Sequence, residues 1–176
     1  MNSYQFPLTS ATLYYDYLSY KDLKSWEKFF LNNPDLRFVG IDNPQAAPIE
    51  SKKWIDRQMA RYTTSGLGIL GAYNQSNHQL VGNGGLIWRE NILGEDVYEI
   101  GYSVIPAYWG KGIASEIAER FMEYFIRHEL GYKVISTIAI ENFASQRIAY
   151  KNGMTKSELF EFQGARCFQF YREFNR

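Results

Sequence analysis

The sequence predicts one α/β (α+β) domain, residues 1–176, with a mixed, mostly antiparallel sheet of about seven strands flanked by about four helices. The length of 176 residues, with 45% apolar and 22% charged residues, suits one domain with one core. Four strand patterns come before a long helix pattern, and a buried strand, a short helix and a hairpin follow it. The chain shows no internal repeat, low-complexity tract or linker that would divide it.

The N-terminal third contains one strand pattern and two helix patterns. The Tyr-rich stretch 11–19 alternates loosely, which predicts a strand. Apolar residues at helical spacing follow Asp22, and Asn32-Asn33-Pro34 ends that helix. Three prolines predict a loop over 34–49, and helical spacing returns over 50–64.

Three apolar segments in the middle of the chain predict neighbouring strands at 66–73, 79–90 and 97–105. The run GNGG, residues 82–85, predicts a β-bulge in the second of them. Pro106 ends the third strand, so the strand that follows it in the sheet can splay away.

The C-terminal part closes the sheet. A long amphipathic helix is predicted from Gly112 to about Glu129, because large apolar residues recur at four-residue steps. The β-branched run 132–140 predicts a strand buried on both faces. We expect a short helix at about 144–152 and a two-stranded hairpin over the tail.

Composition argues against several classes of function. The 19 basic and 19 acidic residues balance, which gives no support for a nucleic-acid or membrane-surface partner. Cys167 is the one cysteine, and His78 and His128 lie far apart, so we expect no disulfide and no metal site. The first residues lack a signal-peptide pattern and no apolar run is long enough to span a membrane, so we expect a cytoplasmic protein.

The stretch YWGKGIASE, residues 108–116, places two glycines around a lysine just before the long helix. Helix N-termini that a ligand can approach closely bind phosphate groups. A nucleoside-triphosphate loop is excluded, because Ile105 and Gly112 stand where that motif needs Gly and Ser or Thr.

Three interpretations of this turn remain. A dinucleotide fingerprint fits two glycines but has Ser115 at the third position and only one βαβ unit. A coenzyme A pyrophosphate cradle fits the helix start, and the splayed strand 99–104 would offer backbone groups to the pantetheine arm. A loop that simply enters a helix is the third.

Four segments in this order resemble the GNAT acetyltransferases, and within them the branch that includes ribosomal-protein N-terminal acetyltransferases. The resemblance covers about residues 97–156 and rests on EIGY at 99–102, PAYWGKGIA at 106–114, ENFASQR at 141–147 and KNGM at 151–154. It implies the GNAT fold, splayed at the acetyl-CoA site, with acetyl-CoA as cosubstrate and an amine as acceptor.

The resemblance also implies donor-binding residues. Backbone N–H groups around Gly110 would hold the pyrophosphate, the end of the strand would hold the pantetheine, and Lys151 would lie near the nucleotide. The expected set is Ser103, Val104, Ile105, Trp109, Gly110, Lys111, Gly112, Ile113, Ala114, Asn142, Ser145 and Lys151.

The chain departs from the family pattern at two positions. Ala107 stands where the phosphate motif often begins with Gln or Arg, which removes a side chain but not the backbone cradle. Ala149 stands where many members carry a catalytic Tyr, and Tyr150 is turned from it by roughly 100°. The branch that this chain resembles often lacks that Tyr.

Acetyl transfer to an amine requires a deprotonated amine, a donor for the oxyanion and stabilisation of the leaving thiolate. We expect Glu99 as general base, directly or through water, the Val104 N–H as oxyanion donor and Ser145 beside the thiolate. Tyr102 and Tyr150 are alternatives. Alternatively, Glu99 has a purely structural role in a salt bridge, and Ser145 caps its own helix.

The acceptor side is less specific. Its walls are expected from the first two helices, the loop 34–49 and the hairpin, where Glu158 and Glu161 are candidates to attract a cation. We therefore expect an acetyl-CoA-dependent N-acetyltransferase, monomer or homodimer, that acts on a protein N-terminus or a small amine by direct attack in a ternary complex. The alternatives are a non-catalytic acyl-CoA sensor and a dinucleotide-binding protein.

Overall fold

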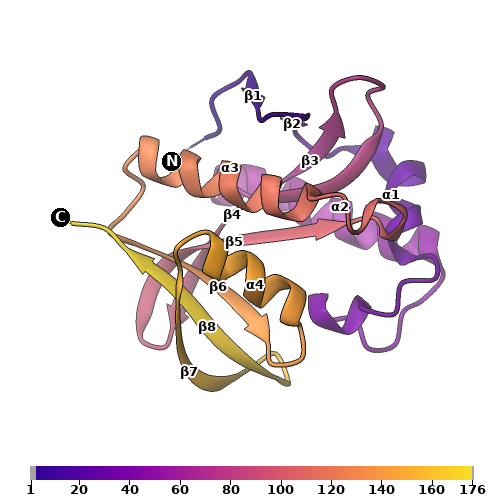
Figure 1. The fold of residues 1–176 in the computed structure, drawn as a ribbon. Helices are drawn as coiled ribbons and strands as arrows, with labels where there is room; N and C mark the ends of the chain where they lie inside the picture. The colour runs from indigo at the N-terminus through magenta and orange to yellow at the C-terminus, as the bar shows by residue number, and fades with distance from the viewer. Residues whose placement is uncertain (1–2, 176) are drawn as a thin grey trace.

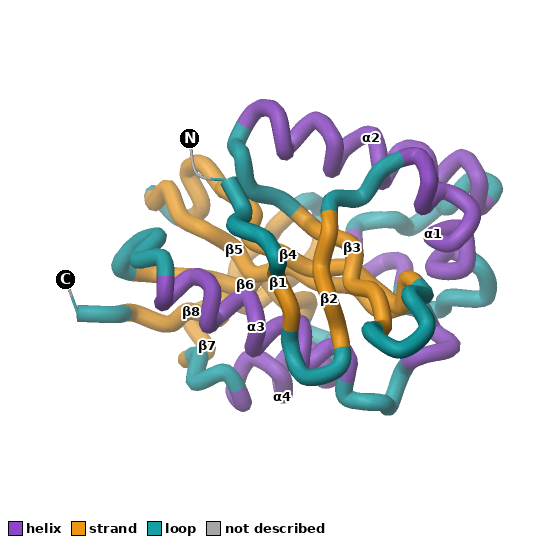
Figure 2. Tube along the Cα trace, turned by 90° about the horizontal axis from the view of Figure 1, so that it is seen from above, coloured by secondary structure: helices purple, strands orange, loops and turns teal. Residues whose placement is uncertain are grey.

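The computed structural model describes residues 3–175, so residues 1–2 and 176 of the expected domain lie outside the described part. One sheet has the strand order β1-β2-β3-β4-β5-β6-β8-β7, with helices on both faces (Figures 1 and 2). The strands are β1 Leu8–Thr9, β2 Leu13–Asp16, β3 Ile69–Asn74, β4 Leu80–Ile92, β5 Glu95–Val104, β6 Lys133–Ala139, β7 Thr155–Phe162 and β8 Ala165–Glu173. The α-helices are α1 Leu23–Phe30, α2 Ala47–Thr64, α3 Ile113–Arg127 and α4 Phe143–Lys151.

The sheet is antiparallel except where β5 meets β6, which confirms the expected mixed topology. The parallel register of these two strands contains only the pairs Tyr98↔Val134 and Glu99↔Ile135. β5 continues to Val104 beside β4, while β6 stays paired with β8 along its whole length. The centre of the sheet therefore forks after Glu99, and we call this opening the fork.

Several elements differ from the expectation at their ends. The two-residue β1 was not expected, and it adds an eighth strand at the edge of the sheet. α2 begins at Ala47, within the expected loop, because a proline fits the first turn of a helix, where its missing N–H is not needed. The same loop also contains the short 3₁₀ helix η2, Leu36–Val39, which lies against the site.

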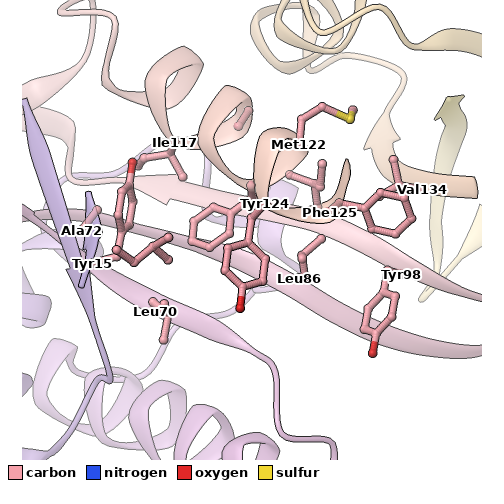
Figure 3. Packing of buried hydrophobic residues seen from close by; sticks show 14 of the residues in the cluster. Tyr15, Leu70, Ala72, Leu86, Tyr98, Ile117, Met122, Tyr124, Phe125 and Val134 are labelled. Carbon is pink, nitrogen blue, oxygen red and sulfur yellow. The ribbon is translucent and has the colours of Figure 1, made fainter. Parts of the chain in front are cut away.

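The glycine-rich part of β4 combines a bulge with a close helix contact. The register against β3 passes from Ala72↔Gly82 to Tyr73↔Leu80, so Val81 is the extra residue. A Cβ on Gly84 would lie 2.2 Å from Ile117 Cγ2, so the missing side chain lets α3 pack directly on the sheet. Ile117 and Phe121 are fully buried there. Figure 3 shows Ile117 in the core between α3 and the sheet.

A second core fills the opposite face, between the sheet and helices α1 and α2. Trp26 stacks on Phe29 with ring centroids 4.6 Å apart, and Trp54 of α2 packs against both. These aromatic contacts fix α1 and α2 relative to each other, and the core that they belong to also includes Tyr73 and Leu80 of the sheet. None of the helices between residues 3 and 175 has both the length and the hydropathy that crossing a bilayer requires.

Candidate functional site

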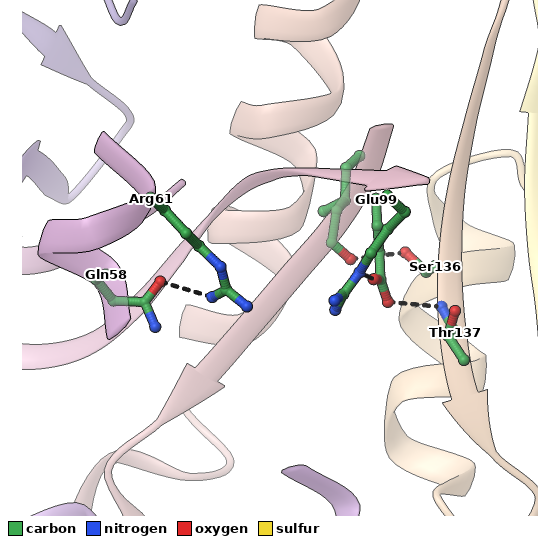
Figure 4. Close-up of polar contacts among 7 residues, drawn as sticks. Gln58, Arg61, Glu99, Ser136 and Thr137 are labelled. Carbon is green, nitrogen blue, oxygen red and sulfur yellow. Dashed lines mark hydrogen bonds and ion pairs between the residues drawn. The ribbon is translucent and has the colours of Figure 1, made fainter. Parts of the chain in front are cut away.

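The fork is closed at its base by side chains instead of strand pairing. Ser136 Oγ donates a hydrogen bond to the Ile100 carbonyl at 2.9 Å, and the Thr137 N–H donates to Glu99 Oε1 at 3.2 Å (Figure 4). The buried Glu99 carboxylate also forms an ion pair with Arg89 Nε. Glu99 thus satisfies a backbone N–H that the divergence of the strands would leave unpaired.

Beyond Glu99, backbone groups of β5 face the fork. The Ile105 N–H donates to the Val81 carbonyl at 3.0 Å, so by strand alternation the Val104 N–H points the other way, into the fork. The Val104 carbonyl accepts a hydrogen bond from the Trp109 indole at 2.7 Å. Ile105 itself is 1% exposed and packs in the core, apart from the cavities at the fork.

A cleft of about 500 Å³ lies on the α3–α4 side of the fork. Most residues of the expected donor set line it: Ser103, Val104, Trp109, Gly110, Gly112, Ile113, Ala114, Asn142, Ser145 and Lys151. Lys111 is not among them. Its Nζ hydrogen-bonds to the Ala107 carbonyl at 3.1 Å and lies over the Tyr108 ring.

The glycine turn forms an open concavity before α3. Gly110 and Gly112 have φ of 74° and 81°, and a Cβ at either would meet nothing within 4 Å. Gly112 is the N-cap of α3, and no side chain caps the first N–H groups of that helix. The turn therefore presents free N–H donors and the positive end of the helix dipole to open space, which fits a pyrophosphate.

The start of α4 brings two hydroxyl groups together. Asn142 Oδ1 caps the helix by accepting the Ser145 N–H at 3.1 Å, so Ser145 does not serve as the cap. The Ser145 side chain lies close enough to the Tyr102 hydroxyl to affect its pKa. Burial raises the pKa of Tyr102 to about 12, and the nearby Ser145 side chain only partly offsets this effect. Tyr102 is therefore a protonated donor at neutral pH.

Some of the remaining residues of α4 line the larger cleft, and others point away from it. Tyr150 is 52% exposed and packs edge-on against Phe170, away from both cavities at the fork. Arg147 lines the cleft one helical turn before Lys151, so two cations face it together. Sequence reasoning did not select Arg147, although its four-residue spacing from Lys151 would have indicated it.

A smaller cavity of about 230 Å³ lies on the α2 side of the fork. It shares part of its wall with the larger cleft, and the shared residues are Phe38, Val39, Tyr102, Ser103, Asn142 and Ser145. Its charged lining consists of Arg37, Arg57, Arg61, Arg89 and Glu99. Glu158 and Glu161 line neither cavity, so the expected acidic wall is replaced by a basic one.

Comparison with known proteins agrees with this architecture. The profile described as "Acetyltransferase (GNAT) domain" matches residues 13–155, which leaves most of the β7–β8 hairpin outside the match. An uncharacterized N-acetyltransferase of Bacillus subtilis (strain 168), YnaD, is 38% identical over 69 residues, 39% of this chain and 41% of that protein. The chain thus aligns with less than half the length of this relative.

Solved structures share the fold at low sequence identity. A putative ribosomal-protein-serine acetyltransferase from Vibrio cholerae superposes with a TM-score of 0.78 at 16% identity, covering 98% of this chain and 99% of that one. The ribosomal L7/L12 α-N-protein acetyltransferase RimL, solved with coenzyme A, gives a TM-score of 0.74 at 17% identity, covering 96% and 97%.

Proposed function

Because the chain belongs to the GNAT acetyltransferase family, we propose that it acts as a single domain, residues 1–176, that transfers the acetyl group of acetyl-CoA to a primary amine. The observation that carries the proposal is the meeting of two cavities at the fork, with Tyr102 and Ser145 in their shared wall. A donor in the larger cleft and an acceptor in the smaller one would meet there. A sensor that only binds acyl-CoA has no use for the second cavity.

The donor would lie along the larger cleft. Backbone N–H groups from Gly110 to Ala114 would hold the pyrophosphate, and Arg147 and Lys151 would face the nucleotide phosphates. The Val104 edge would pair with the pantetheine arm as an added strand does. The coenzyme A bound by RimL, which shares this fold, supports the same choice of cosubstrate.

The thioester supplies an activated acyl carbon. The amine nitrogen attacks that carbon, the C–N bond forms, the C–S bond breaks, and coenzyme A leaves as a thiol while the amine loses a proton. The Val104 N–H, directed into the fork, would stabilise the oxyanion. Tyr102, held protonated by burial and placed beside Ser145, would donate the proton to the leaving sulfur.

We retain Glu99 as the base, acting through water. Among the residues described, it is the one carboxylate that lines the smaller cavity. Its ion pair with Arg89 and its hydrogen bond from Thr137 hold it at the base of the fork. A water between Glu99 and the ammonium group of the acceptor would carry the proton away from the reaction centre.

The proposal is tested by supplying acetyl-CoA with a panel of peptides and small amines and following thiol release. We expect turnover with at least one amine and none in its absence. Titration calorimetry with acetyl-CoA and with NAD separates the remaining alternatives. Tight acetyl-CoA binding without turnover on any amine would favour a sensor, and preferential NAD binding would overturn the coenzyme A cradle.

A further inference from the structure

The wall of the smaller cavity formed by α2 carries a stripe of polar and aromatic side chains. Trp54, Arg57, Gln58 and Arg61 follow the i, i+3, i+4, i+7 spacing of one helix face, and all four line the cavity. Figure 4 shows Arg61 extending from α2 towards the strand that carries Glu99. The stripe therefore presents two guanidinium groups to the space opposite the base of the fork.

The positive charges in this cavity are only partly matched. Arg37 and Arg89 form ion pairs with Glu141 and Glu99. Within residues 3–175, by contrast, no carboxylate lies within 4.0 Å of the guanidinium nitrogens of Arg57 or Arg61. Arg61 donates to Gln58 Oε1 at 2.8 Å, and Arg57 lies 5.9 Å from the centre of the Trp54 ring.

Arg61 is in an unfavourable electrostatic setting when the cavity holds no anion. Desolvation, together with the nearby charges of Arg89 and Arg57, lowers its pKa to about 10, although Glu99 has a smaller opposing effect. An oxyanion placed between Arg57 and Arg61 would reverse this penalty through charge-assisted hydrogen bonds. The guanidinium fork matches a carboxylate or a phosphate in shape as well as in charge.

We propose that the acceptor is a small primary amine that carries a carboxylate or phosphate group, with this anionic end bound by Arg61 and Arg57. The inference rests on the proposed transferase function and deepens it by naming the class of acceptor. The volume of about 230 Å³ is below that of a site for a drug-sized ligand, which favours a molecule of amino-acid size. With its anion at α2, the amine reaches toward the shared wall at Tyr102 and Ser145.

The test uses matched amines that differ in the anionic group. β-Alanine is compared with propylamine, and O-phosphoethanolamine with ethanolamine, at saturating acetyl-CoA. We expect kcat/KM to be roughly 10- to 100-fold higher for the preferred anionic member, as a charge-assisted hydrogen bond allows. The two pairs also distinguish a carboxylate site from a phosphate site.

Variants then assign the preference to the stripe. Arg61→Gln should remove most of the anionic preference, Arg61→Lys should keep part of it, and Arg57→Gln should reduce it independently. Arg127→Gln, an exposed arginine on α3 outside the cavities at the fork, is the matched control and should change nothing. Unchanged acetyl-CoA affinity in each variant shows that the fold is intact. Equal rates for charged and neutral amines, or a preference that survives Arg61→Gln, would overturn the inference and leave the transferase intact.

A binding measurement separates the two proposals. The shift in melting temperature with O-phosphoethanolamine or β-alanine is recorded in the presence of coenzyme A, without turnover. Stabilisation of the wild type that is lost in Arg61→Gln, together with no acetylation of any amine, would refute the transferase function and support the anion site. Strong turnover on peptides with neutral N-terminal residues would instead refute the small anionic acceptor.

Discussion

Replacing Gly110 by alanine separates strain in the fold from loss of the phosphate cradle. Gly110 has a φ of 74°, and its new methyl group would meet no protein atom within 4 Å. Alanine in this left-handed conformation costs roughly 1–2 kcal/mol, and the smaller entropy of the unfolded chain returns about 0.4–1 kcal/mol. We therefore expect a net loss of about 1 kcal/mol, which lowers the melting temperature of a domain of this size by about 2–4 °C.

The chain contains a matched control at the turn between β4 and β5. Gly94 has a φ of 86°, also has nothing within 4 Å of a built Cβ, and lines neither cavity at the fork. Gly94→Ala should therefore show a similar melting shift and bind acetyl-CoA normally.

In Gly110→Ala the methyl group would enter the space of the pyrophosphate and displace at least one charge-assisted hydrogen bond of about 1.5–3 kcal/mol. We expect the Kd for acetyl-CoA, measured by calorimetry, to rise roughly 10- to 100-fold. Equal affinities in the two variants would refute the cradle.

Three further predictions concern single side chains. Tyr102→Phe should lower kcat at least tenfold with little change in acetyl-CoA affinity, and an unchanged kcat would exclude Tyr102 as the acid. Because burial raises the pKa of Tyr102 to about 12, the wild-type rate should show no alkaline loss from this group below that pH. Glu99→Gln should lower kcat and change the pH–rate profile, whereas a loss of thermal stability with an unchanged profile would leave only its role in the fork. Glu116 accepts hydrogen bonds from Ser10 and Thr12, and although burial opposes them, these bonds hold the pKa of its carboxyl below the ordinary value. The stabilisation from Glu116 is present above its unfolded pKa and is lost as pH falls through its folded pKa. At acidic pH the melting temperature should therefore fall more steeply with decreasing pH for the wild type than for Glu116→Gln.

Periodic patterns in the sequence predicted most of the fold, because a long helix or strand repeats its apolar spacing over many residues. The apolar residues of α3, at four-residue steps, placed that helix, and the β-branched run of β6 identified a central strand. β1 has only two residues, and its pairing with β2 depends on tertiary contacts, so no local pattern could reveal it. The bulge was predicted from the GNGG run, but only the register identified Val81 as the extra residue.

The two sides of the candidate site differed in how well the sequence predicted them. The donor side depends on backbone geometry that a short contiguous motif encodes, so Gly110 and Gly112 could be recognised along the chain. The acceptor side is assembled from α2, η2, the fork and the β7–β8 hairpin, which only the fold brings together. Arg61 looks like an ordinary exposed helix residue in the sequence, and its partial burial beside Arg89 becomes visible only in the fold.

The β7–β8 hairpin suggests how such an enzyme would acquire a new substrate. Strand β8 of the hairpin pairs with β6 at seven positions, while the tip of the hairpin, at Phe162 and Gln163, lines the smaller cavity. None of residues 152–175 lines the larger cleft. Under the proposed function, mutations at the tip would therefore change the acceptor site at little cost to folding or to acetyl-CoA affinity.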